Sequence, residues 1–355
     1  MTGRDSSTDW LPASPHEAGF AADLVERLEA GTRSGLLCGL HAVLVARGGR
    51  LVLERYFSGA DESWGRPLGA VAFGPDTLHD LRSITKSVVG LLYGIALDRG
   101  VVPPLQTPLL AAFPEHADLA GDRRRASLTV AHALDMTMGL EWDERRPYTD
   151  PANSEIAMEA APDRTRFALE RPIVADPGTR WIYSGGAVAL LGSLIAKGAG
   201  TSLPGFARAA LFEPMGIRTF EWARGRDGVA SAASGLRLRP RDLLRLGRMV
   251  LDGGRWNGRA IVPADWIAAS RTPAVPTGDG LNYSRLWYIG DAPVPAFAGL
   301  QPWMAGFGNG GQRLWVMPGA DLTVATLSGR YNAPDAGVTP TRVWREIVLA
   351  SLERP

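Results

Sequence analysis

The stretch Leu81-Arg-Ser-Ile-Thr-Lys-Ser-Val-Val-Gly-Leu-Leu92 decides how the rest of the chain is interpreted. It opens a helix predicted over 83–98, which is apolar on nearly every face and must therefore be buried. Ser83 and Lys86 are three residues apart, so both side chains point to one side of the first helical turn. A neutral lysine in that position can take the proton of the serine hydroxyl, which makes the pair a candidate for nucleophilic catalysis.

Lysine is almost absent from this chain. Lys86 and Lys197 are the only two lysines among 38 basic residues, so the other 36 are arginine. A guanidinium does not lose its proton near neutral pH, so a retained lysine points to chemistry that needs an amine. Burial and neighbouring groups are expected to bring the pKa of Lys86 from ~10.4 towards 7. The alternative interpretation is an N-cap serine followed by a solvent-facing lysine.

Length and composition indicate a globular protein without a nucleic-acid partner. The 355 residues suggest two domains or one large one, with 45% apolar residues, 21% charged residues and a formal net charge of +1. The single cysteine, Cys38, excludes an intrachain disulfide and a cysteine-based metal site. The polar start lacks the apolar stretch of a signal peptide, and no apolar segment approaches the ~20 residues of a bilayer span. We therefore expect a cytoplasmic protein with no membrane partner.

Hydrophobic patterns predict strands near both ends of the chain and helices between them. Hairpins are expected over 41–57 and 312–327, which suggests an α+β fold with one antiparallel sheet built from both termini and flanked by helices. A helical domain is inserted, so the expected domains are 1–82 with 225–355, and 83–224, with the active site in the cleft between them. Further helices are predicted over 15–31, 129–138, 186–197, 203–212, 240–252, 263–270 and 341–352.

Several familiar catalytic motifs are missing from the sequence. It has no Gly-x-Ser-x-Gly elbow, no His-Glu-x-x-His pair and no phosphate loop ending in Gly-Lys-Ser/Thr. Gly306-Phe-Gly-Asn-Gly-Gly311 contains a dinucleotide pattern, but a strand follows it where a helix is required. The histidines at 16, 41, 79, 116 and 132 do not cluster at ligand spacing, and His41 is interpreted as structural. No metal or organic cofactor is expected.

Two further segments are candidates to complete a site with the Ser-x-x-Lys pair. Tyr183 lies just before a Gly-Gly break and an apolar helix, where its phenol could share a proton with Lys86. The run Gly308-Asn-Gly-Gly-Gln312 leads into an apolar strand, and its glycines leave amides free to hold an oxyanion. Taken alone, a tyrosine is usually a core or surface residue, and a glycine-rich run is equally an ordinary loop.

In this order, the three motifs resemble the serine β-lactamase and penicillin-binding-protein superfamily along roughly residues 15–350. The closest branch contains class C-related enzymes, family VIII-type esterases and aminohexanoate-dimer hydrolases. Ser83 and Lys86 match its Ser-x-x-Lys, and Tyr183-Ser184-Gly185 matches its tyrosine motif. Its edge-strand element is matched by the four residues Asn309, Gly310, Gly311 and Gln312.

The resemblance implies a β-lactamase/transpeptidase-like fold and an acyl-enzyme on Ser83, with Lys86 and Tyr183 as general base and acid. It also implies an oxyanion hole at the amides of Ser83 and Gln312. Tyr148 matches, by position only, a loop tyrosine that closes over substrate in the aminohexanoate branch; an ordinary surface tyrosine is the alternative. Trp142, Trp181 and Trp303 are candidates for an acyl pocket, with core packing as the alternative.

Two departures from the family pattern indicate which activity to expect. Gly185 stands where asparagine would hold a lactam amide, and Asn309 stands where a lysine or histidine would bind a substrate carboxylate, although Arg313 or Arg330 could replace that cation. We therefore expect a serine hydrolase of small carboxylic esters or amides. The alternatives are a β-lactamase or D-alanyl-D-alanine carboxypeptidase, and a non-catalytic binding protein of the same fold. The expected partner is the small-molecule substrate, with a homodimer as one option for assembly.

Overall fold

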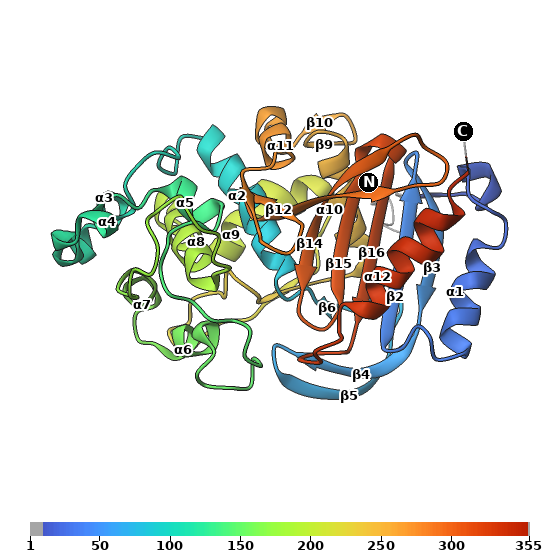
Figure 1. Ribbon diagram of the computed structural model, residues 1–355, viewed down its shortest axis with the longest axis horizontal. Coiled ribbons are helices and arrows are strands. Elements are labelled where there is room, and N and C mark those ends of the chain that lie inside the picture. Colours follow the sequence, from blue (N-terminus) through green and yellow to red (C-terminus); the bar gives the residue numbers. More distant parts are fainter. Residues whose placement is uncertain (1–9, 354–355) are drawn as a thin grey trace, which may run out of the picture. The chain divides into compact units, whose positions relative to one another are not determined.

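The computed structural model describes residues 10–353, which form two compact units (Figure 1). Unit 1 comprises Met1–Leu81, Arg237–Asp252 and Gly290–Pro355, and unit 2 comprises Arg82–Leu236 and Gly253–Ile289. Residues 253–289 thus lie in unit 2, whereas the sequence expectation assigned them to the discontinuous α/β domain.

Unit 1 is built on an antiparallel sheet that joins the two ends of the chain. Strand β2 (Leu40–Arg47) pairs with β16 (Leu322–Ser328), and Val45 lies opposite Val324. The order continues outward through β3 (Arg50–Tyr56) to the parallel β1 (Leu11–Pro12) on one side, and through β15 (Gln312–Met317) to β14 (Leu300–Gly308) on the other. This confirms the α+β class and both hairpins, which were predicted from apolar runs on either side of a turn.

Helices cover both faces of this sheet. On β15, Leu314 packs near Gly247 of α10 (Pro240–Leu251), whereas the next residue, Trp315, stacks on Trp344 at a ring distance of 5.1 Å. Successive strand residues point to opposite faces, so α10 and the C-terminal segment lie on opposite sides of the sheet. That segment consists of α12 (Val338–Arg342), η7 (Val343–Val348) and η8 (Leu349–Ser351).

The N-terminal helix is shorter than predicted, because the chain turns before it. The prediction of one helix over 15–31 is wrong: a short turn, η2 (His16–Ala18), ends at Gly19 with a left-handed φ of 71°, and α1 (Leu24–Arg33) follows. Gly31 is buried within α1 against Leu37, so it does not terminate the helix.

Several strands of the structure have no apolar run and were not predicted from the sequence. Strands β4 (Ser58–Ser63) and β5 (Arg66–Ala72) form a separate hairpin rich in polar and small residues. The short strand β6 (His79–Asp80) pairs with β8 (Leu236–Leu238), and β7 (Glu221–Trp222) extends that small sheet. Four more short strands and β13 lie in the second half: β9 (Arg255–Trp256), β10 (Arg259–Ala260), β11 (Val275–Pro276), β12 (Asn282–Ser284) and β13 (Trp287–Pro293).

Unit 2 is organised around one buried helix. Helix α2 (Ile84–Asp98) is buried from Ile84 to Ala96, and α8 (Gly185–Ala199) packs against it. The helix predicted to 138 ends earlier, as α5 (Val130–Leu134), because Met136 takes a left-handed φ of 58°. The remaining helices are α3 (Leu109–Ala112), η3 (Pro114–Gly121), α4 (Arg123–Ala126), α6 (Ser154–Ala160), α7 (Arg164–Leu169), α9 (Leu203–Ala207), η4 (Arg208–Phe212), η5 (Glu213–Met215) and α11 (Ala264–Ser270).

Among the described residues, no single helix has the length and apolar character to cross a bilayer. Helix α8 and the segment Leu203–Met215 reach that length and apolar character only when they are taken together, and the two are bent by 72° relative to each other.

The histidines are not all separate, as their spacing in the sequence suggested. His41 on β2 and His79 on β6 are 38 residues apart along the chain, yet His41 Nδ1 and His79 Nε2 lie 2.8 Å from each other. The expectation that no histidines cluster is therefore wrong, since strand pairing and not local spacing brings them together.

The close packing of α2 gives a stability prediction. A Cβ added at Gly90 would lie 2.7 Å from the backbone carbonyl oxygen of Arg285, so the Gly90→Ala variant must move backbone. We expect it to lower the free energy of unfolding by about 1–2 kcal/mol, because overpacking outweighs the gain in helix propensity. Urea unfolding measures the difference. Gly121→Ala is the control, since a Cβ there meets open space, and equal effects of the two substitutions would contradict this packing.

Candidate active site

Ser83 stands at the N-terminus of α2 with its hydroxyl directed into a polar cluster. The preceding residue, Arg82, has a φ of 49°, a left-handed conformation that marks a strained turn. Among the described residues, no backbone amide is capped by the Ser83 side chain. Instead Ser83 Oγ accepts a hydrogen bond from Lys86 Nζ at 3.0 Å and is also hydrogen-bonded to the hydroxyl of Tyr183. The serine is thus placed for chemistry and does not act as a side-chain cap.

The Lys86 ammonium group is buried, with only 1% of the residue exposed. Its three donors meet three acceptors: Ser83 Oγ at 3.0 Å, Ala233 carbonyl oxygen at 3.1 Å and Glu155 Oε2 at 3.2 Å. The alternative of a solvent-facing lysine is therefore wrong.

Two buried carboxylates face this ammonium group, and they reverse one expectation from the sequence. Glu155 Oε2 lies 3.2 Å and Glu144 Oε2 lies 3.7 Å from Lys86 Nζ. Burial lowers the pKa of Lys86, but the attraction of Glu144 and Glu155 outweighs burial and raises the pKa above its ordinary value. The prediction of a lysine pKa near 7 is therefore wrong, and Lys86 is an ammonium ion at neutral pH.

Neither carboxylate was identified from the sequence. Glu155 is in the first turn of α6, where Asn153 caps the helix by accepting from the amides of Glu155 and Ile156. An acid in a first turn usually interacts with the helix dipole, so its sequence position gave no signal. Glu144 lies in the loop after Trp142, whose indole Nε1 donates to Glu144 Oε1 at 2.6 Å.

The group in this cluster that titrates near neutrality is Glu144. Burial raises its pKa to about 7, against the opposing attraction of Lys86, and the nearby charge of Glu155 raises it further. Three donors hold the carboxylate: the Trp142 indole, the Gly185 amide at 2.5 Å and the Tyr148 hydroxyl at 2.9 Å. The proton of this carboxyl group is therefore exchanged within the pH range in which a hydrolase works.

Glu155 connects the cluster to a second buried ion pair. Its Oε1 accepts from Ser234 Oγ at 2.5 Å, and Ser231 Oγ lies 3.4 Å from Ser234 Oγ. Ser231 donates in turn to Glu159 Oε1 at 2.7 Å, and Glu159 pairs with Arg164 at 2.9 Å. This network fixes the Glu155 carboxylate and so fixes the position of Lys86.

Tyr183 lies immediately before α8, with Lys86 Nζ 4.9 Å from the centre of its ring. Burial raises the pKa of the Tyr183 phenol, whereas the Lys86 charge lowers it. Its neighbour Ser184 caps α8, because Ser184 Oγ accepts from the amide of Ala187 at 3.2 Å. Ser184 therefore has a structural task next to the catalytic candidate.

The structure gives a physical reason for Gly185. A Cβ at this position would lie 2.7 Å from Glu155 Oε2 and 2.9 Å from Glu144 Oε1. The two carboxylates fill the space beside the tyrosine motif, so the asparagine of the resembled family does not fit here.

A pocket of about 700 Å³ lies beside this cluster within unit 2. Tyr148, predicted as a loop residue over the substrate, lines it together with Tyr183, and so do Trp142 and Trp181. The complete lining is Trp142, Asp143, Glu144, Arg145, Tyr148, Thr179, Arg180, Trp181, Ile182, Tyr183, Val275, Pro276, Thr277, Gly278 and Tyr288. Its wall is thus aromatic, with equal numbers of acidic and basic residues.

The predicted edge-strand residues belong to unit 1, where they form the β14–β15 turn. Gly310 and Gly311 have φ values of 86° and 96°, which only glycine adopts readily. The Gln312 side chain donates to the carbonyl of Ser328 and accepts from its amide, and Asn309 Oδ1 accepts from the amide of Asn332 at 3.0 Å. All four residues therefore stabilise the turn itself.

The two arginines proposed as substitute cations have partners within unit 1. Arg330 is paired with Asp335, and Arg313 donates to the carbonyls of Gly308 and Gln312. Trp303 is buried in unit 1.

The fold, together with the cluster of Ser83, Lys86 and Tyr183, is that of a β-lactamase/transpeptidase-like protein. The chain belongs to the β-lactamase family, which matches residues 21–347, and it is a hydrolase of that fold. It is 28% identical over 357 residues to the 6-aminohexanoate-dimer hydrolase of Paenarthrobacter ureafaciens, covering 91% of this chain and 77% of the relative.

Solved structures of a hydrolase and of a carboxylesterase share the fold. EstCE1, a hydrolase with promiscuous acyltransferase activity, superposes with a TM-score of 0.72 at 18% identity, covering 92% of this chain and 98% of the other. A family VIII carboxylesterase gives a TM-score of 0.68 at 16% identity, covering 95% and 99%. The family resemblance inferred from the three motifs is thereby confirmed.

The buried charges predict how stability depends on Lys86. Lys86→Met leaves Glu144 and Glu155 without their cation, so we expect a loss of about 3–5 kcal/mol in the free energy of unfolding at pH 8. Burial raises the folded pKa of the Glu144 carboxyl, and removing the Lys86 charge removes the attraction that opposes this rise. The folded state then binds more protons than the unfolded state, so the stability of the variant falls as pH rises from about 5 to 8.

Urea unfolding at several pH values tests this expectation, with Lys197→Met as the matched control. Lys197 is the other lysine, half-exposed and paired with Glu115, so its loss is expected to change stability by less than about 1 kcal/mol. A Lys86→Met variant as stable as the control at pH 8 would show that the buried ion cluster is not formed.

Proposed function

We propose that this protein hydrolyses small carboxylic esters or amides through an acyl-enzyme on Ser83. The observation that carries the proposal is the convergence of Lys86 Nζ and the Tyr183 hydroxyl on Ser83 Oγ, in a buried setting close to an aromatic-walled pocket. A nucleophilic serine needs an adjacent base, and Tyr183 can serve as that base after losing its phenolic proton, with the Lys86 ammonium ion stabilising the resulting charge.

The reaction proceeds in two halves. Ser83 Oγ attacks the substrate carbonyl as its proton passes to Tyr183 Oη, once the phenol has given up its own proton to solvent. Burial raises the pKa of that phenol, and the Lys86 charge opposes the rise by stabilising the tyrosinate form. The proton then goes to the leaving alcohol or amine, and water attacks the ester on Ser83 to release the acid. The amides of Ser83 and Gln312 are the proposed oxyanion donors. No metal or organic cofactor takes part in these steps.

The choice of ester or amide over lactam rests on Gly185 and Asn309. Gly185 offers no side-chain amide to a lactam substituent, and the carboxylates that exclude a larger residue there also repel an anionic substrate. Asn309 supplies no positive charge, and its side-chain oxygen is already bonded to the Asn332 amide. The related hydrolase and esterases support the same choice. A β-lactamase or D-alanyl-D-alanine carboxypeptidase remains the alternative function.

A non-catalytic binding role is the second alternative. It does not explain why Lys86 is fully buried and bonded to the serine, because a binding pocket gains nothing from an ammonium ion desolvated at that position. A cytoplasmic location and a homodimer remain predictions from the sequence.

Removing the nucleophile tests the mechanism directly. We expect Ser83→Ala to abolish turnover of a short-chain nitrophenyl ester and labelling by a fluorophosphonate probe, while the thermal unfolding temperature stays within a few degrees. Ser87→Ala is the matched control, because Ser87 is a buried serine one turn further on whose hydroxyl donates to the Leu286 carbonyl oxygen. Activity in a folded Ser83→Ala variant would exclude the serine mechanism.

Substrate charge distinguishes the proposed function from the lactamase alternative. We expect kcat/KM for a neutral short-chain ester to exceed that for a cephalosporin by at least about a hundredfold, or ~2.7 kcal/mol. We expect Asn309→Lys to reduce this ratio of kcat/KM values. A thermal unfolding scan checks that the variant keeps its fold after losing the hydrogen bond to the Asn332 amide. Faster hydrolysis of the cephalosporin by the wild-type enzyme would favour the lactamase alternative.

A further inference from the structure

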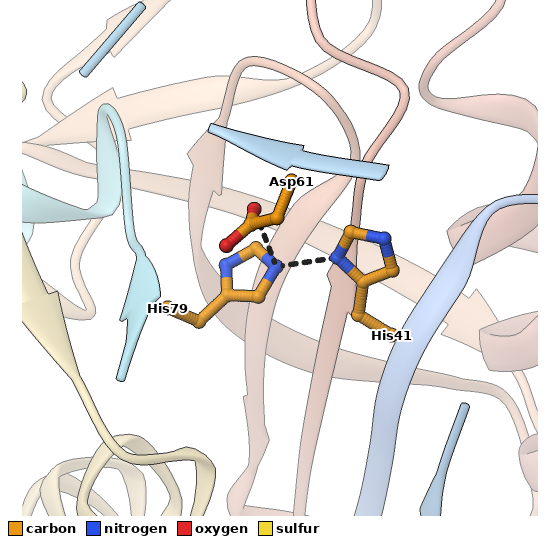
Figure 2. Close-up of side chains that lie close together, drawn as sticks. All are labelled: His41, Asp61 and His79. Atoms are coloured by element: carbon orange, nitrogen blue, oxygen red, sulfur yellow. Dashed lines mark hydrogen bonds and ion pairs between the residues drawn. The ribbon is translucent and has the colours of Figure 1, made fainter. Parts of the chain in front are cut away.

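Three buried side chains of unit 1 form a second polar cluster, which shares no residue with the Ser83 cluster. His41 comes from β2, Asp61 from β4 and His79 from β6, and their exposed fractions are 1%, 5% and 0% (Figure 2). One ligand atom from each lies within 4.8 Å of the others. None of these residues has a task in the proposed hydrolysis.

The hydrogen bonds of the two imidazoles fix their protonation. His79 Nδ1 lies 2.9 Å from the carbonyl oxygen of Asp80, which only accepts, so this nitrogen carries the hydrogen. The lone pair of His79 Nε2 therefore points into the cluster, where His41 Nδ1 lies 2.8 Å away (Figure 2). A histidine whose Nδ1 is held by a backbone carbonyl presents Nε2 as metal-binding histidines do.

Asp61 directs its carboxylate towards the same point. Its Oδ1 lies 3.9 Å from His79 Nε2 and accepts from the Tyr331 hydroxyl at 2.9 Å. Its Oδ2 is buried and has no hydrogen-bond partner in the described part of the chain. A buried carboxylate oxygen without a donor is costly, and a bound cation would remove that cost.

We propose that His41 Nδ1, His79 Nε2 and Asp61 bind one divalent transition-metal ion, with Zn²⁺ as the favoured ion. Bonds of 2.0–2.2 Å to nitrogen and oxygen place the ligands of a tetrahedral site about 3.3 Å apart, so the present spacings of 2.8 Å and 3.9 Å bracket that value. Binding moves the His41 hydrogen from Nδ1 to Nε2 and changes no oxidation state. A fourth ligand would come from water or from the Tyr331 hydroxyl, which lies 2.9 Å from Asp61 Oδ1.

The donor set and its surroundings indicate the kind of ion and its role. Two imidazoles and one carboxylate suit zinc and its neighbours, whereas Ca²⁺ and Mg²⁺ need more oxygen ligands. Arg237 lies 3.7 Å from Asp61 Oδ2 and weakens the attraction for any cation, although its Nε is also 3.1 Å from Asp80. Because the site is buried, it is structural: the ion would fasten β2, β4 and β6 to one another.

Zinc binding to the full-length protein tests the proposal. After treatment with EDTA and dialysis, Zn²⁺ is titrated in competition with a chromophoric chelator, and bound metal is counted by mass spectrometry. We expect one Zn²⁺ per chain and a thermal unfolding temperature that rises with Zn²⁺ concentration. All measurements use a Cys38→Ser background, because the exposed Cys38 thiol could bind zinc by itself.

Variants separate this site from surface binding. Asp61→Asn keeps the size of the side chain and an acceptor for Tyr331, and we expect it to weaken Zn²⁺ binding at least tenfold. His79→Gln is the second variant, for use if the first does not fold. His16→Gln, which removes an exposed histidine, is the matched control and should bind Zn²⁺ as the parent does.

The result is decisive in either direction. Less than one tightly bound Zn²⁺ per chain in the parent protein overturns the proposal without any variant. It is equally overturned if a folded Asp61→Asn or His79→Gln variant binds Zn²⁺ as tightly as the His16→Gln control. Stoichiometric binding that is lost only in the cluster variants supports it.

Discussion

The constraint on which unit 2 depends is the burial of one ammonium ion. Lys86 is in the first turn of α2 and is buried, so each proton of its ammonium group must meet an acceptor within the protein. Ser83 Oγ, the Ala233 carbonyl and Glu155 supply those acceptors. The neighbouring sequence accommodates this set: Asn153 caps the helix that presents Glu155, Ser234 holds the same carboxylate, and Gly185 leaves room for it.

This arrangement changes where a proton is available near neutral pH. The carboxylates hold Lys86 as a cation, so it does not serve as a free base; its charge limits the rise that burial causes in the pKa of the Tyr183 phenol. Burial also raises the pKa of the Glu144 carboxyl, to about 7. The cluster thus contains a permanent positive charge, a phenol bonded to the serine and an acid that titrates at working pH. A serine can be activated with these three groups and no metal ion.

Local patterns predicted much of the fold and the centre of the site. Apolar runs on either side of a turn predicted the β2–β3 and β15–β16 hairpins, and the apolar run after Ser83 predicted α2, because these signals depend on residues close together in sequence. The hairpin β4–β5 has no such apolar runs and was missed. Glu155 looked like an ordinary first-turn acid, and the pairing of His41 with His79 depends on strands far apart in sequence. Contacts between residues far apart in the chain produce no periodic pattern in the sequence.

The two buried polar clusters differ in whether their hydrogen-bonding capacity is used. Around Lys86, each donor has an acceptor and the positive charge has its counter-ions, so the group is stable as it stands. Around His79, the Nε2 atom has only the His41 imidazole as its hydrogen-bond partner, and Asp61 Oδ2 accepts no hydrogen bond from the described residues. A cluster with surplus donors attracts an anion, and one with surplus acceptors attracts a cation. The same requirement, that buried polar atoms be satisfied, therefore underlies both the ion cluster around Lys86 and the metal binding that we propose at His41, Asp61 and His79.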